Sequence, residues 1–294
     1  RSYNRYEPSR LVSTVLHLPR TSHLPRRRAW TAFSAVQKKR DKLMRGFMTF
    51  IVFCLISSVV YIINDIRDAE KDRCHPTKCN RPIASGAISI KNATVLACVL
   101  FMFTIICSWL VLNVNVVALL LLYLVINVGY SFGLKNIPIV DVTILVSGFL
   151  IRIICGAIAT DIAISNWLYL TVITLAFYFA LGKRRNELKK VGDNTTRKVL
   201  KAYSVEFLDK SMYMCLTLAN VFYALWSMDE KTVTLYGSEQ LVYTVPIVIL
   251  ITMKYSLNIE GDSDGDPVEV LVHDKILVVL CLIYFCVMFG FLYV

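Results

Sequence analysis

Long apolar blocks separated by short polar stretches dominate this chain. A helix needs about 20 apolar residues to cross the roughly 30 Å hydrocarbon core of a bilayer, and eight blocks reach or approach that length. They do not alternate in ten-residue segments, as the strands of a membrane β-barrel would. The blocks are Phe47–Ile63, Ala93–Leu112, Val116–Leu134, Ile139–Thr160, Trp167–Gly182, Met212–Met228, Leu241–Leu257 and Ile276–Val294. We therefore expect an all-α, polytopic transmembrane helix bundle.

The charge distribution supports this topology. The net charge is +11, which would also suit a nucleic-acid-binding protein. However, beyond residue 46 nearly all Lys and Arg fall in alternate loops (64–92, 135–138, 183–210 and 259–275), and the intervening loops hold only Lys231. This asymmetry follows the positive-inside rule. We expect an integral, multi-pass protein of the plasma membrane with those loops in the cytoplasm, and no nucleic-acid partner.

Residues 1–46 differ from the rest of the chain. They are rich in Arg, Ser and Pro, contain two "HLPR" copies, and include no apolar run that could span a membrane. Bases stand on both sides of the first block, so a single crossing would leave one basic cluster outside. We interpret 1–46 as an atypical basic segment preceding a transmembrane catalytic region at 47–294, and expect a first span that is missing or altered.

The first apolar block ends in a polar run that begins at Asn64 and contains Asp65, Asp68 and Asp72. If the helix continues, offsets of three and seven residues place the three carboxylates on one stripe. Such carboxylates repel unless a cation lies between them. Mg²⁺ takes one or two protein carboxylates and completes its shell with water and substrate phosphates. The run predicts a Mg²⁺–diphosphate site; the alternative is a solvated helix end paired with neighbouring bases.

Several bases stand close to the ends of these blocks. Both Arg and Lys bind phosphate, Arg in a bidentate manner and Lys as a point charge. Tyr130, Lys135 and Asp141 form one cluster in "YSFGLKNIPIVD". The other basic candidates are Lys78 and Arg81 in the loop after the carboxylates, and Lys183, Arg184 and Arg185 in "ALGKRRNEL". Their alternative role is positive-inside anchoring.

Arg152 lies inside an apolar block, eleven residues after Asp141 and on the same helical face. Ionisable groups at such depth line functional cavities or pair with an acid. Asp141 is about three turns away, too far for direct contact. We therefore interpret Arg152 as lining a polar cavity, with an ion pair to another helix as the alternative.

The cysteines predict neither a disulfide framework nor a metal centre. Most lie within apolar blocks, where a free thiol packs as a small hydrophobe. Cys74 and Cys79 bracket His75 in "CHPTKC", but that spacing fits no usual zinc pattern. We interpret them as loop thiols.

Two motifs carry a family resemblance. "NDIRDAEKD…NRPIASG" resembles the first aspartate signature of the UbiA superfamily of intramembrane prenyltransferases, and "YSFGLK…D" resembles its second conserved segment. Within the superfamily, "HPTKCNRPIASG", "SGFLIRIICGAIAT", "ALGKRRNEL" and "GDPVEVLVHDK" resemble the decaprenyl-phosphate phosphoribosyltransferases. The resemblance covers roughly Phe47–Val294.

The resemblance implies a bundle, usually of nine spans, around a cavity open to the cytoplasm and to lipid. It implies Mg²⁺-dependent transfer of 5-phosphoribose from phosphoribosyl pyrophosphate (PRPP) to a decaprenyl-like polyprenyl phosphate, releasing pyrophosphate, for a cell-envelope arabinose precursor. Asp65 and Asp68 would hold Mg²⁺, supported by Asn64 and Asp72. The phosphate contacts would come from Lys78, Arg81, Tyr130, Lys135 and Lys183–Arg185.

Two other functions remain possible at this point. An aromatic prenyltransferase of the same superfamily usually carries a second DxxxD-type motif, whereas 183–210 holds a basic run without that spacing. Bases in place of acids suit the additional phosphate of PRPP. A transporter would often show internal repeats and broken helices, and no repeat is visible. An oligomer is possible, and the sequence does not specify one.

Overall fold

The computed structural model describes residues 24–74, 78–111, 113–191, 198–237, 239–261 and 267–293. The first "HLPR" copy and His75 of "CHPTKC" lie outside these ranges. The chain divides into two compact units, Arg1–Met44 and Arg45–Val294. The packing and the sites described below all belong to the second unit.

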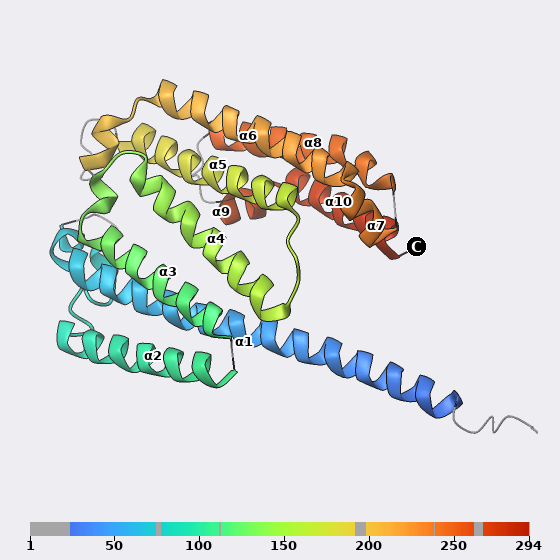
Figure 1. Ribbon diagram of the computed structural model, residues 1–294. Coiled ribbons are helices and arrows are strands. Elements are labelled where there is room, and N and C mark those ends of the chain that lie inside the picture. Colours follow the sequence, from blue (N-terminus) through green and yellow to red (C-terminus); the bar gives the residue numbers. More distant parts are fainter. Residues whose placement is uncertain are drawn as a thin grey trace, which may run out of the picture. The chain divides into compact units, whose positions relative to one another are not determined.

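The described residues form helices and contain no strand (Figure 1). The short 3₁₀ turns are η1 (Lys78–Asn80), η2 (Leu134–Asn136), η4 (Lys198–Ala202) and η5 (Glu239–Thr244). The α-helices are α1 (Leu24–Arg73), α2 (Ile90–Val111), α3 (Val114–Phe132), α4 (Val140–Thr160), α5 (Asn166–Val191), α6 (Val205–Met228), α7 (Glu230–Tyr236), α8 (Val245–Glu260), α9 (Pro267–His273) and α10 (Lys275–Tyr293). The predicted all-α class is confirmed.

Six of the described helices are long and apolar enough to cross a bilayer, fewer than the eight expected. These segments are Arg40–Arg73, Ile90–Trp109, Val114–Phe132, Val140–Thr160, Glu239–Glu260 and Lys275–Leu292. The other two predicted spans, Trp167–Gly182 and Met212–Met228, lie within α5 and α6 but are not among the six. Their apolar stretches are short, contain Tyr and Thr, and adjoin charged residues at the C-terminal end of α5 and the N-terminal end of α6. The two helices pack closely along each other.

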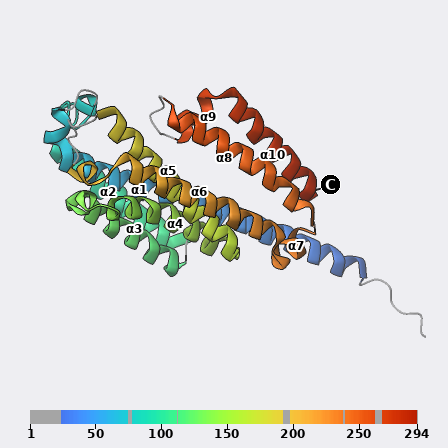
Figure 2. The same ribbon diagram turned by 90° about the horizontal axis from the view of Figure 1, so that it is seen from above.

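The buried side chains form two main clusters that share α4. Val142 and Val146 of α4 pack with α5, α6, α8 and η4. Further along α4, Ile151 and Cys155 pack with α1 and α3 instead. The helix therefore links the two halves of the second unit. The helices after α6, including the paired α8 and α10, are seen from above in Figure 2.

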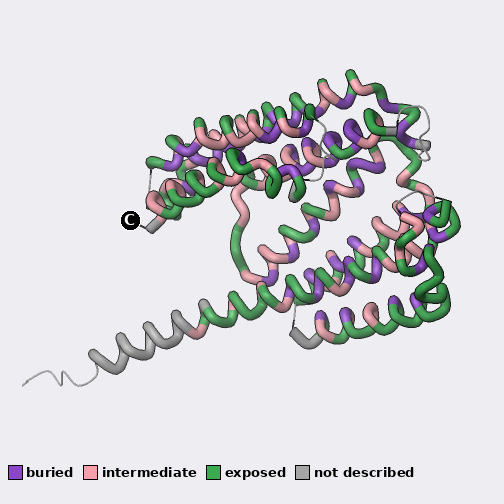
Figure 3. The backbone as a smooth tube through the Cα atoms, turned by 180° about the vertical axis from the view of Figure 1, so that it is seen from behind, coloured by how far each residue is buried: buried purple, intermediate pink, exposed green. Residues whose placement is uncertain are grey.

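Large apolar side chains remain exposed on several helices. Along α2 most residues are exposed (Figure 3), including Val99, Phe103 and Trp109. On α10, Phe285 and Phe289 are exposed as well. Extended apolar surface of this kind indicates contact with a membrane. The protein is an integral membrane protein.

Candidate functional site

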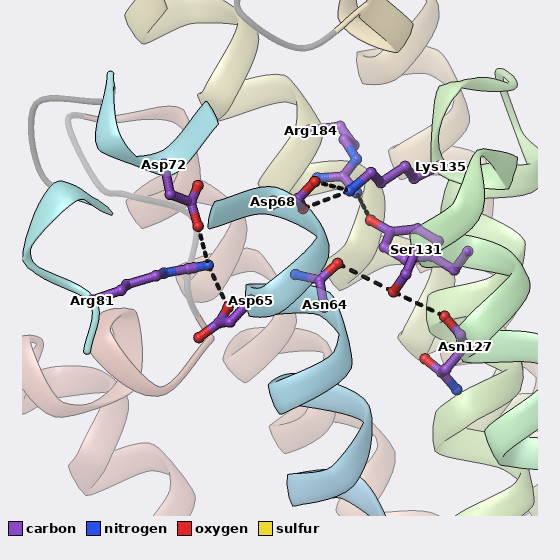
Figure 4. Close-up of polar contacts among 10 residues, drawn as sticks. Asn64, Asp65, Asp68, Asp72, Arg81, Asn127, Ser131, Lys135 and Arg184 are labelled. Carbon is purple, nitrogen blue, oxygen red and sulfur yellow. Dashed lines mark hydrogen bonds and ion pairs between the residues drawn. The ribbon is translucent and has the colours of Figure 1, made fainter. Parts of the chain in front are cut away.

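The three carboxylates on the last turns of α1 each have a basic partner (Figure 4). Arg81 Nη1 lies 2.8 Å from Asp65 Oδ1 and 2.9 Å from Asp72 Oδ2. Lys135 Nζ donates to Asp68, with its nitrogen 2.7 Å from Oδ1. Since α1 continues to Arg73, the carboxylates do follow one helix, and two bases divide them. We refer to these five residues as the carboxylate rim.

Local structure fixes the two bases of the rim. The loop that carries Arg81 packs against α1, since Ile83 is buried beside Ala69 and Arg73 Nε donates to the Ala84 carbonyl at 3.1 Å. Lys135 follows Gly133, where α3 ends with a φ of 151°. This φ lies in the region that favours glycine, so the turn that presents Lys135 depends on that residue.

A cavity of about 400 Å³ lies next to the rim. Its polar wall is formed by side chains from α1, α3, α4, α5 and the loop after η1. The residues of this wall that were predicted as site residues are Asn64, Arg81, Tyr130, Arg152, Lys183 and Arg184. We call this space the rim cavity. Lys78 lies in η1, outside its lining.

The deeper wall contains three α3 residues that the sequence reading missed. Tyr123, Asn127 and Ser131 all line the rim cavity. Ser131 Oγ donates to Asn64 Oδ1 at 3.3 Å, which orients the amide on α1. Their spacing of four residues within an apolar block places them on one helical face, and that polar stripe was the available signal.

Arg184 is buried at the end of α5 and held by several partners. Its Nε donates to Asp141 Oδ2 at 2.7 Å, its Nη1 to Glu187 Oε2 at 3.0 Å, and its Nη2 to the Tyr130 hydroxyl at 3.4 Å. A buried charge is stable only when paired and hydrogen-bonded. Arg184 therefore contributes a fixed positive charge to the cavity wall.

Tyr203 completes this cluster from the loop before α6. Its hydroxyl donates to Asp141 Oδ1 at 2.7 Å and accepts the backbone N–H of Ile139. Ile139 has a φ of 68°, unusual for a branched residue. Burial, together with the contact to Asp141, raises the pKa of Tyr203 to about 12. The phenol therefore stays protonated and donates to the carboxylate at neutral pH.

Asp141 and Arg185 were expected to contact substrate, but the structure places neither on the wall of the rim cavity. Asp141 is fully buried beneath it and compensates Arg184. Arg185 is also buried; its Nε pairs with Asp209 and its Nη1 donates to the Ile259 carbonyl at 3.4 Å. The physical reason is desolvation, since a charged group at a buried position requires a protein partner. Both residues support the wall from behind.

The rim has the donor chemistry for Mg²⁺, but not as a three-carboxylate cage. Among the described residues no group of three or more His, Cys, Asp or Glu is arranged to hold a metal ion. Asp72 is buried behind Arg81, which leaves Asp65 and Asp68 as the half-buried carboxylates of the predicted set. Two carboxylates are sufficient for Mg²⁺ when substrate phosphates supply further oxygens.

Comparison with known proteins finds relatives that match this chain over most of their length. The chain is 34% identical over 256 residues to the decaprenyl-phosphate phosphoribosyltransferase of Mycolicibacterium smegmatis, covering 82% of this chain and 78% of that protein. It is also 34% identical to the protein of the same name from Corynebacterium glutamicum, covering 83% of this chain and 74% of that protein.

Solved structures share the fold. A UbiA homolog from Archaeoglobus fulgidus, bound to GPP and Mg²⁺, superposes with a TM-score of 0.62 at 18% identity, covering 86% of this chain and 89% of that one. The model of the UbiA prenyltransferase family matches residues 29–262. The chain therefore belongs to the UbiA prenyltransferase family.

Proposed function

We propose that this protein transfers 5-phosphoribose from PRPP to a polyprenyl phosphate and releases pyrophosphate, at a site facing the cytoplasm from the plasma membrane. The observation that carries the proposal is the charge of the rim cavity wall, where Arg81, Arg152, Lys183 and Arg184 line the space next to two carboxylates. The relatives named above support the same reaction.

PRPP matches this distribution of charge because it is anionic at both ends. Its pyrophosphate suits the rim, where Arg81 and Lys135 already neutralise carboxylates and can turn toward phosphate oxygens. Its 5-phosphate suits the bases at the end of α5. A prenyl diphosphate has a single anionic end and would leave part of this wall without a partner.

In this reaction the bond between ribose C1 and the pyrophosphate oxygen breaks as an oxygen of the lipid phosphate bonds to C1. The acceptor oxygen is already anionic, so no strong general base is needed. Arg81 and Lys135 stabilise the negative charge that grows on the departing pyrophosphate. Arg184, fixed by Asp141, offers a positive charge that requires no reorganisation during the reaction.

Asp65 and Asp68 are the residues that would hold Mg²⁺. When bound there, the ion would neutralise pyrophosphate charge as a Lewis acid. The need for this ion is part of the proposal, as is a role for the product in synthesis of a cell-envelope arabinose precursor.

Transfer of label into lipid tests the proposal. Membranes containing the protein would receive polyprenyl phosphate, Mg²⁺ and PRPP labelled in the ribose, and we expect label in the organic phase. A parallel reaction would contain labelled prenyl diphosphate and an aromatic acid. Label in the aromatic product alone would overturn the proposal in favour of an aromatic prenyltransferase.

The Asp68→Asn variant provides the matched chemical test. It retains the shape of the side chain but removes a carboxylate charge, and we expect transfer to fall by about a hundredfold or more. Glu230→Gln, an exposed carboxylate on α7, serves as the control and should retain full activity. Full activity in Asp68→Asn would exclude a role for this carboxylate.

A further inference from the structure

Arg152 is an unusual charge because it lies inside a membrane-spanning helix. It is in the candidate span Val140–Thr160, twelve residues or about 18 Å along α4 from Val140. Its guanidinium carbon lies 4.8 Å from the ring centre of Phe53 and 5.8 Å from that of Phe149. Within the described part of the chain it forms no ion pair. A cation at this depth requires compensation, and an anionic ligand would supply it.

Two spaces meet at this side chain. Arg152 and Tyr61 line the rim cavity and also a second cavity of about 520 Å³. The second space runs between α1 and α4, from Gly46 and Phe50 to Gly156. We call it the α1–α4 groove. Arg152 therefore stands where a polar cavity joins a groove along two membrane-spanning helices.

The α1–α4 groove has the character of a lipid-chain site. Phe50 and Phe53 are apolar members of its lining, and Phe50 and Cys54 are exposed on the flank of α1. The lining also includes hydroxyl-bearing residues, which are Thr49, Ser57, Ser58 and Tyr61. At Gly156 an added Cβ would meet no atom within 4 Å, so the floor there is open. The lining carries no charged residue other than Arg152.

We propose that Arg152 binds the phosphate of the polyprenyl phosphate acceptor and that the isoprenoid chain occupies the α1–α4 groove. This inference rests on the proposed function and assigns the acceptor's place in it. A lipid phosphate needs a cation for its headgroup and a groove in the membrane for its chain. Arg152 supplies the cation and lies at the end of such a groove. PRPP is water-soluble and finds its cations at the rim and at the end of α5.

The direction of the side chain fits this assignment. Side chains on a helix point toward its N-terminus, and the N-terminal end of α4 carries Asp141, the partner of Arg184. Arg152 therefore directs a bound phosphate toward the rim cavity. There, one phosphate oxygen forms the bond to ribose C1 while pyrophosphate leaves with the electron pair of the broken C1–O bond.

Ligand binding without turnover tests the assignment of Arg152. The purified protein in detergent would be heated with farnesyl phosphate, with farnesol or with PRPP. We expect farnesyl phosphate to raise the unfolding midpoint of the wild type and farnesol to raise it less. In Arg152→Gln, farnesyl phosphate should no longer raise the unfolding midpoint, whereas PRPP should still raise it. In Arg152→Lys, part of the stabilisation by farnesyl phosphate should return. In transfer assays, Arg152→Gln should raise the acceptor KM at least tenfold and the PRPP KM less than twofold.

A second pair of variants tests the groove. Gly156→Leu fills open space and should raise the KM for decaprenyl phosphate at least tenfold, with little effect on farnesyl phosphate. Gly290→Leu on α10, where a Cβ also meets nothing within 4 Å, is the matched control and should change neither. If Gly156→Leu changes the particle mass and leaves the KM for decaprenyl phosphate unaltered, the groove binds a second copy of this chain. That result would overturn its role as a site for the isoprenoid chain.

The outcomes separate this inference from the proposed function. If the wild type transfers no ribose but Arg152→Gln selectively loses farnesyl phosphate binding, the anion site is supported and the proposed phosphoribosyl transfer is wrong. Ribose transfer with loss of PRPP binding in the same variant would place Arg152 with the donor and overturn the inference. Retention of both ligand effects would overturn it as well.

Discussion

Two acid–base clusters meet at the rim cavity, and they differ mainly in burial. In the carboxylate rim, the Arg81 side chain is 38% exposed and that of Asp65 27%, and the Lys135 and Asp68 side chains are 12% and 17% exposed. In the cluster behind the wall, Arg184 is 3% exposed and Asp141 is fully buried. A partly exposed ion pair adds little to the free energy of unfolding and can exchange its partners for water or ligand. A buried ion pair is fixed, because separating it would leave a charge that neither water nor a partner stabilises. The rim is therefore suited to bind ligands, and the buried cluster to hold its geometry.

The largest expected effect follows from removing the buried acid. Asp141→Asn leaves the Arg184 guanidinium without its main anion, and loss of one partner of a buried pair destabilises a protein by about 3–5 kcal/mol. We expect a marked drop in the thermal unfolding midpoint of the protein in detergent. The double variant Asp141→Asn/Arg184→Gln should recover part of the loss. A wild-type midpoint in the single variant would contradict the fixed role of this pair.

The corresponding change in the rim should separate activity from stability. In Arg81→Gln, the half-buried Asp65 stays within reach of water, but the buried Asp72 loses its ion-pair partner. We therefore expect a loss of about 1–3 kcal/mol in the free energy of unfolding, smaller than the loss in Asp141→Asn. Ribose transfer should fall by about a hundredfold because a phosphate contact is lost. Lys231→Gln, an exposed base on α7, is the control. A large loss of stability in Arg81→Gln with normal transfer kinetics would show that Arg81 stabilises the fold and does not bind substrate.

Tyr203→Phe tests a neutral member of the buried cluster. The variant loses the hydrogen bond to Asp141, and we expect a loss of about 1–2 kcal/mol in the free energy of unfolding. The folded-state pKa of Tyr203 is raised to about 12 from an ordinary value of 10.0. Folding therefore favours the protonated phenol.

The stabilisation by Tyr203 should consequently be complete below pH 10 and disappear as the pH rises through about 12. Unfolding of the wild type and of Tyr203→Phe, measured between pH 8 and 12 under the same conditions, isolates this contribution. A difference between the two proteins that grows with pH would be the wrong sign.

The smallest effect is expected at a solvent-exposed pair. Lys210 Nζ lies 2.7 Å from Glu206 Oε1, and both side chains are 76% exposed. Lys210→Ala should change the free energy of unfolding by only about 0.3–0.5 kcal/mol and leave transfer unaltered. A loss similar to that of Asp141→Asn would mean that burial does not separate the clusters.

Much of the fold follows from local sequence. Uninterrupted apolar blocks predict helices, and the carboxylates follow α1 because that helix simply continues past the apolar block. By composition, α5 and α6 fall outside the six candidate spans because their apolar stretches contain more polar residues.

The structure brings several of the predicted residues to one cavity, but which of them pair could not be predicted from the sequence. Lys135 is 67 residues from Asp68 and Tyr203 is 62 from Asp141, and such contacts depend on tertiary packing that no local spacing encodes. The same limit applies to burial. Arg184 and Lys183 are adjacent bases in the sequence, yet one is buried in a network and the other is exposed on the cavity wall.

The straight run of α4 also sets a length. Asp141, which holds the Arg184 charge, and Arg152 are eleven residues apart on this one helix, a separation of about 16 Å along its axis. One helix therefore carries both Arg152 and the acid that anchors Arg184, so the same element positions two of the cations that line the rim cavity.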